Sequence, residues 1–158
     1  KEKASFYSDE NRKQEIFSFR AEKIADIHGR FFVEDNDGKK IGAFKKQFAK
    51  SLLNSTWDIL DKNDKTRITI NESNQALALL RRFIGFVPIV GEILELLTNF
   101  FKYHFSFRDE KGNEVGKYQK IKLFRDHYAL HFEDDSWEKN DWRVLAAVAV
   151  ALDALQSR

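Results

Sequence analysis

The chain has 158 residues, enough for one domain that hides roughly 70% of the surface it would expose when unfolded. Its 27 basic and 25 acidic residues leave a formal net charge of +2, so no overall field draws the chain onto nucleic acid. We therefore expect no nucleic-acid partner. The absence of cysteine excludes disulfides, thiolate nucleophiles and thiolate zinc sites, and it fits a reducing, cytoplasmic compartment.

The N-terminal segment, residues 1–15, is polar and lacks the apolar stretch of a targeting signal. We expect a solvated lead-in there, followed by a single domain over residues 16–158. An aromatic share of 14% in the whole chain favours half-buried pleated strands over disorder.

An internal repeat marks the next part of the chain. Residues 33–42 and 107–116 share Asp, Gly, an aliphatic residue and a second Gly at the same spacing. Asp bonds the backbone just ahead of it and Gly accepts positive φ, so Asp-x-x-Gly between apolar runs predicts a hairpin. A third, less exact copy covers residues 57–70, where residues 61–64 take the turn.

Apolar and polar residues alternate around these turns, as they do in half-buried strands. Tyr128, Leu130 and Phe132, for example, share one face of a strand. So many short strands joined by tight turns favour a barrel or a sandwich. The predicted strands cover residues 16–20, 23–28, 30–34, 41–48, 55–60, 66–70, 103–108, 115–123 and 127–132.

We expect an apolar insert at residues 74–101, divided into two short helices by Gly85, Pro88 and Gly91. Its longest uncharged run is well short of the roughly 18 to 20 residues that a bilayer requires. The insert has two readings. In the first, its apolar side chains pack on its own domain as a cap, which is the commoner arrangement for an apolar helix face. In the second, they contact a membrane interface or a partner. The residues for that contact are Phe83, Ile84, Phe86, Ile93 and Leu97.

The C-terminal helix, predicted at residues 141–156, carries no polar side chain between residues 144 and 152. A helix that is apolar all round is buried all round, and its alanines keep it slim. Both properties suit a helix threaded through a ring of strands. A membrane anchor is the rival reading, but the run is too short for one.

These hairpins and the final helix resemble the tubby-like C-terminal superfamily, which includes the phospholipid scramblases and the LURP-one-related proteins. The resemblance implies a mainly β (α+β) fold, a closed antiparallel barrel of about twelve strands around a buried apolar helix, with a short helical insert. Members with known roles bind phosphoinositides or act at membranes. The acidic calcium segment and the cysteine cluster of the scramblases have no counterpart here, which argues against calcium-triggered scrambling.

Clusters of basic residues are the candidate sites for an anionic partner such as phospholipid or a membrane surface. Lys46 and Lys120 are equivalent in the repeat, so we expect them at related positions. The competing reading is that lysines on the outer face of a strand serve solvation and protect sheet edges. The candidates are Lys45, Lys46, Lys50, Arg81, Arg82, Lys117, Lys120 and Lys122.

No catalytic, metal or cofactor site emerges from the motifs. Residues 35–38 match a fragment of a calcium loop, but the first and twelfth ligand positions hold Val33 and Phe44. His127 and His131 lie on one predicted strand, roughly 13 Å apart, which is too far for one ion. The sequence therefore predicts a protein that is not an enzyme and has no cofactor.

Two functions remain open. The first is a membrane-associated or anionic-lipid-binding domain, peripheral at the membrane. The second is a soluble protein–protein interaction module that uses the insert or the acidic loop at residues 133–141. A small-ligand carrier needs a cavity, and a helix that fills a barrel leaves none.

Overall fold

The computed structural model describes residues 3–22, 29–47, 55–72, 104–122 and 127–156. The predicted strand at 23–28 and the predicted insert at 74–101 lie outside the described residues. So do the candidate site residues Lys50, Arg81, Arg82, Phe83, Ile84, Phe86, Ile93 and Leu97.

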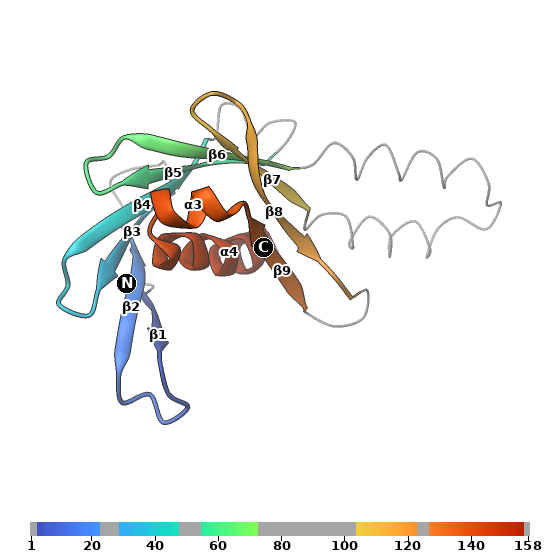
Figure 1. The fold of residues 1–158 in the computed structure, drawn as a ribbon. Helices are drawn as coiled ribbons and strands as arrows, with labels where there is room; N and C mark the ends of the chain where they lie inside the picture. The colour runs from blue at the N-terminus through green and yellow to red at the C-terminus, as the bar shows by residue number, and fades with distance from the viewer. Residues whose placement is uncertain (1–2, 23–28, 48–54, 73–103, 123–126, 157–158) are drawn as a thin grey trace.

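Within the described residues, nine strands form one antiparallel sheet in which each strand pairs with its neighbours in the chain (Figure 1). Two helices, α3 (Asp134–Lys139) and α4 (Trp142–Gln156), follow the last strand. The strands are β1 (Lys3–Tyr7), β2 (Glu15–Ala21), β3 (Arg30–Asp35), β4 (Lys40–Lys46), β5 (Thr56–Asp61), β6 (Thr66–Glu72), β7 (Phe105–Asp109), β8 (Glu114–Lys120) and β9 (Tyr128–Phe132).

The three copies of the repeat form three hairpins of the same build, β3–β4, β5–β6 and β7–β8. Asp35 Oδ1 accepts the backbone amides of Asp37 at 3.1 Å and Lys39 at 2.9 Å. Asp61 and Asp109 accept the equivalent pair of amides in the other two turns. The predicted hairpins are thus confirmed, including the less exact copy. The turn residue with positive φ is Gly38, Asp64 or Gly112.

Each of these hairpins also carries a β-bulge in its second strand. The pairing skips Ile41 in β4, Arg67 in β6 and Val115 in β8, at equivalent positions of the repeat. An extra residue bends the strand and increases its twist. Three bulges at one level therefore help the sheet to curl.

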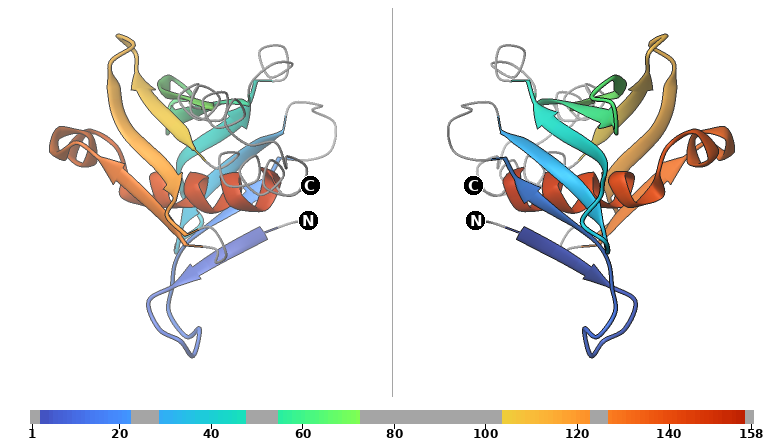
Figure 2. Two further views of the ribbon diagram at one scale, coloured as in Figure 1. Left: turned by 90° about the vertical axis from the view of Figure 1, so that its right-hand side faces the viewer. Right: turned by 90° about the vertical axis from the view of Figure 1, so that its left-hand side faces the viewer.

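The curled sheet holds α4 on its concave face (Figure 2). Apolar side chains from both layers are buried between them and form one hydrophobic core. The sheet contributes mainly aromatic and branched residues, among them Phe17, Val33, Phe44, Ile59, Ile70, Phe105 and Phe107. The helix contributes Val144, Leu145, Ala147, Val148, Ala151 and Leu152.

The prediction of a closed barrel of about twelve strands is wrong. The described sheet runs from β1 to β9 and is not closed. On the open side α4 leaves Val150 44% exposed and Trp142 49% exposed, so the helix is not buried all round. Proteins leave much apolar surface in water, and an apolar helix therefore does not require a complete ring of strands.

Strand β1 lies within residues 1–15, where we expected a solvated lead-in. Its Phe6 ring stacks on Phe17 of β2, with ring centroids 4.2 Å apart. Pairing with β2 makes this part of the segment an edge strand of the sheet. The acidic segment 133–141, expected as a loop, contains α3.

Candidate functional site

The antiparallel order divides the sheet into two ends. The turns that join β1 to β2, β3 to β4, β5 to β6 and β7 to β8 lie at one end, which we call the turn end. At the other end, which we call the connection end, β2, β4, β6 and β8 finish at Ala21, Lys46, Glu72 and Lys120. Candidate basic residues gather at the connection end.

Lys46 and Lys120 occupy equivalent positions there, as the repeat predicts. Each lies on the concave face, two residues after a buried aromatic side chain of its strand. Lys46 Nζ lies 5.7 Å from the ring centroid of Trp57, its register partner on β5. Lys120 Nζ lies 5.7 Å from the ring centroid of Tyr128, its register partner on β9. Both ammonium groups are thus positioned by a cation–π contact with the following strand.

The chain after Lys120 adds an apolar side chain to this cationic end. Ile121 is 52% exposed, and Lys122 next to it is also exposed. The backbone amide of Ile121 donates to the carbonyl oxygen of His127 at 2.9 Å, which holds the exit of β8 against the entry of β9. Sequence reasoning missed Ile121, although an aliphatic residue between two lysines at a strand exit is a readable signal.

Two other predicted basic residues do not belong to this group. Lys45 and Lys117 alternate with the concave-face residues and therefore project from the convex face. Lys117 Nζ lies 3.0 Å from Glu114 Oε1, and Lys45 stands opposite Asp58 in the register. Hydrogen bonding to Lys117 lowers the pKa of Glu114 from its ordinary value.

The convex face also carries a cationic cluster that sequence reasoning missed. Arg20, Arg30 and Lys40 surround the ring of Phe32, 5.0 to 5.6 Å from its centroid. Carboxylates neutralise the cluster: Glu34 pairs with Arg20, while the turn residue Asp64 pairs with both Arg30 and Lys40.

The pKa values of this convex cluster follow the same pairing. The hydrogen bonds that Arg20 donates to Glu34 raise the pKa of Arg20. The pKa of Asp64 is lowered, first by its hydrogen bond from Lys40 and then by Arg30. The cluster is therefore largely self-compensated and offers little net charge to an anionic partner.

In the described part of the chain, no group of three or more His, Asp or Glu side chains could hold a metal ion. His131 lies within β9 and His127 immediately precedes the strand, and both are exposed. Asp35 Oδ1 accepts two amides of its own turn, as expected for a hairpin turn. Among the described helices, none is long and apolar enough to cross a membrane.

The sequence profile of the LURP-one-related family matches residues 1–153. The chain belongs to the LURP-one-related family. This family is part of the tubby-like C-terminal superfamily, so the resemblance predicted from the hairpins and the final helix is confirmed. No curated protein and no solved structure matches the chain. In this LURP-one-related protein the hairpins come first and α4 comes last, which is the order of elements that suggested the superfamily.

Proposed function

We propose that this LURP-one-related domain binds anionic phospholipid surfaces through its connection end and acts by binding rather than by catalysis. The observation that supports the proposal is the juxtaposition of Lys120, Ile121 and Lys122 at that end, with Lys46 at the equivalent place on β4. A basic residue near an anionic leaflet contributes about 1 kcal/mol of attraction. A nearby aliphatic side chain adds the hydrophobic part.

These contributions to the binding free energy predict weak, reversible attachment. A few lysines and one isoleucine supply only a few kcal/mol, on the order of what a single lipid chain provides, so the domain is expected to be peripheral. Because Lys122 is exposed and Lys46 and Lys120 are partly exposed, salt should screen the attraction and release the protein.

Co-sedimentation of the full chain with vesicles tests this proposal. Neutral phosphatidylcholine vesicles are compared with vesicles that also contain phosphatidylserine or a phosphoinositide. The double variant Lys120→Glu, Lys122→Glu should lose binding to the anionic vesicles. The matched control is Lys39→Glu, Lys62→Glu, which makes the same charge change at exposed positions of the turn end and should bind normally. Equal binding by both variants, or no binding of the wild type at low salt, would overturn the proposal.

A second candidate function rests on α3. The helix carries Asp134, Asp135 and Glu138, and its Trp137 is 39% exposed beside Phe132, with ring centroids 5.2 Å apart. An exposed tryptophan among acids is typical of a surface that docks a basic protein segment. This function predicts indifference to vesicles and a protein partner whose capture Trp137→Ala abolishes.

A further inference from the structure

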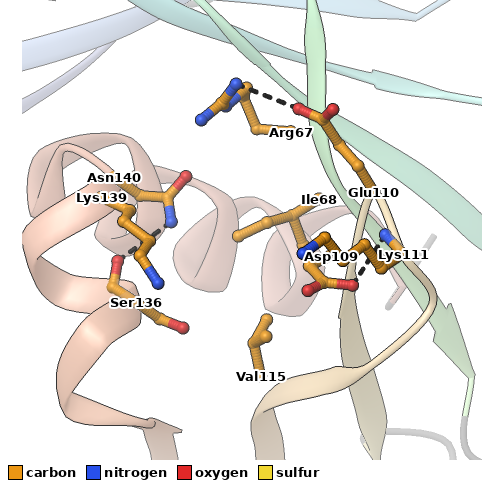
Figure 3. Close-up of a pocket in the computed structure, with 9 residues that line it drawn as sticks. All are labelled: Arg67, Ile68, Asp109, Glu110, Lys111, Val115, Ser136, Lys139 and Asn140. Carbon is orange, nitrogen blue, oxygen red and sulfur yellow. Dashed lines mark hydrogen bonds and ion pairs between the residues drawn. The ribbon is translucent and has the colours of Figure 1, made fainter.

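A cleft opens at the turn end, under the corner between α3 and α4 (Figure 3). It consists of two hollows of about 320 Å³ and about 230 Å³, which share Arg67, Lys139 and Asn140 in their walls. Ile68 and Val115 line the larger hollow with apolar surface. Its volume lies at the lower end of the range for small-molecule sites, roughly 300 to 1,000 Å³.

Arg67 is the residue that distinguishes this part of the fold from its repeats. It occupies the bulge position that Ile41 and Val115 fill in the other two hairpins. Those two aliphatic side chains pack against the core and each lines one hollow, whereas Arg67 lines both hollows and brings a charged group into them. An aliphatic residue would satisfy the packing, so the arginine needs another explanation.

The guanidinium of Arg67 is held by a contact that a ligand could replace. Its Nη1 lies 3.0 Å from Glu110 Oε1, and both side chains are more than a third exposed. Exposed ion pairs of this kind are weak in water. Glu110 Oε2 also lies 3.0 Å from Lys65 Nζ, so Glu110 keeps a cationic partner when Arg67 turns away.

The other carboxylates in the walls already have partners. Asp61 and Asp109 each accept two backbone amides of their own turns, and Asp141 pairs with Arg143 at 2.7 Å. The cations of the walls come from three elements, with Lys111 in the β7–β8 turn and Lys139 at the end of α3 on either side of Arg67. The exposed Lys139 is tied to Asp135 of its own helix at 3.2 Å.

We propose that this cleft binds a small phosphate-bearing ligand, with Arg67 as its principal anion-binding residue. A guanidinium matches phosphate oxygens with two parallel N–H donors, which an ammonium group does not. Lys139 and Lys111 supply further charge, and Ile68 and Val115 contact the ligand's carbon skeleton. The cleft lies at the opposite end of the sheet from Lys46 and Lys120, so its ligand is independent of the membrane contact proposed above.

Titration calorimetry of the full chain at low salt tests the proposal. The probes are inorganic phosphate, soluble inositol trisphosphate, and vesicles that contain phosphatidylinositol bisphosphate. Arg67→Ile copies the residue of the first repeat, so it should fold, and it should weaken binding of the soluble probes about tenfold or more. The affinity of Arg67→Lys for the soluble probes should fall between those of the wild type and Arg67→Ile. Glu110→Gln should strengthen binding because it releases the guanidinium, an outcome that a merely structural pair does not predict.

The choice of probes distinguishes a soluble phosphate ligand from a lipid headgroup, and the variants distinguish this proposal from the membrane contact proposed above. Binding of inositol trisphosphate identifies a soluble ligand, whereas binding of the vesicles alone, lost in Arg67→Ile, identifies a lipid headgroup. The variant Lys120→Glu, Lys122→Glu should leave the soluble probes bound as tightly as in the wild type. Equal affinity in the wild type and Arg67→Ile, or no heat with any probe, overturns the assignment. Backbone amide shifts at residues 67, 111 and 140 of the wild type give the same decision if Arg67→Ile fails to fold.

Discussion

Val144 of α4 lies so close to Gly42 of β4 that a Cβ atom on the glycine would be 2.8 Å from Val144 Cγ2. The same atom would be 2.9 Å from the carbonyl oxygen of Leu60. The second glycine of the repeat therefore serves the close approach of a strand to the helix. Gly116, its counterpart in β8, makes room for the ring of Phe132 in the same way.

Gly42→Ala should lower the free energy of unfolding by about 1 to 3 kcal/mol, because the added methyl group overpacks a rigid backbone contact. Urea unfolding followed by circular dichroism measures the change. Combining Gly42→Ala with Val144→Ala should cost less than the sum of the single variants, since the second change removes one of the clashing groups. Strict additivity would contradict this account of the contact.

Gly38→Ala should cost about 1 to 2 kcal/mol for a different reason. Nothing lies within 4 Å of a Cβ atom at this position, but its φ of 76° is unfavourable for an L residue with a side chain. Gly38→Asn should cost less, because Asn adopts this conformation more readily. The same unfolding experiment compares the two, and a larger loss for Asn would argue against backbone strain as the cause.

Asp141→Ala should destabilise the domain at neutral pH by about 1 kcal/mol, through loss of the cap of α4. The Arg143 amide donates to Asp141 Oδ1 at 3.0 Å, and Arg143 Nη2 donates to Oδ2 at 2.7 Å. Hydrogen bonding to Arg143 holds the pKa of Asp141 below its ordinary value.

The depressed pKa of Asp141 sets the pH window of this effect. Its stabilisation is complete above the unfolded value of about 3.9 and is lost as pH falls through the folded pKa. The difference between wild type and Asp141→Ala should therefore shrink between about pH 5 and about pH 2. Urea unfolding across that range measures it, and a constant difference would count against the pairing.

Ile121→Ser should weaken vesicle binding by about tenfold, since burying an aliphatic side chain of this size contributes about 1.5 to 3 kcal/mol when complete. The matched change at the turn end, Ile41→Ser, is unsuitable because Ile41 packs against the core. Val150→Ser on the open side of α4 is the better control, as Val150 is 44% exposed and distant in sequence from the basic residues. An equal loss of vesicle binding in both variants would show that Ile121 does not contact the membrane.

The sequence predicted the local features of this fold well. The hairpins at Asp35, Asp61 and Asp109 follow from side chains that bond their own turn. The equivalent positions of Lys46 and Lys120 follow from the repeat. Each of these signals lies within a few residues of its effect.

Features that depend on distant pairing were missed. Closure requires the first and last strands to meet, and alternation within each strand carries no information on this. A single large apolar residue, Phe6, was too weak a signal for β1. Strand register shows that Arg67 occupies the same kind of bulge as Ile41 and Val115, which the alternation of residues does not reveal. Aligning residues 57–70 with the other two copies would have shown the exchange.

The central claim is that the connection end of this LURP-one-related domain faces an anionic membrane. Because the chain has no cysteine, Ile121→Cys and Lys62→Cys each provide one labelling site, at the connection end and at the turn end. With a polarity-sensitive fluorophore attached, the label at position 121 should brighten and shift to shorter wavelength on phosphatidylserine vesicles, while the label at position 62 stays unchanged. No response at position 121 on vesicles that bind the protein, or a larger response at position 62, would contradict the claim.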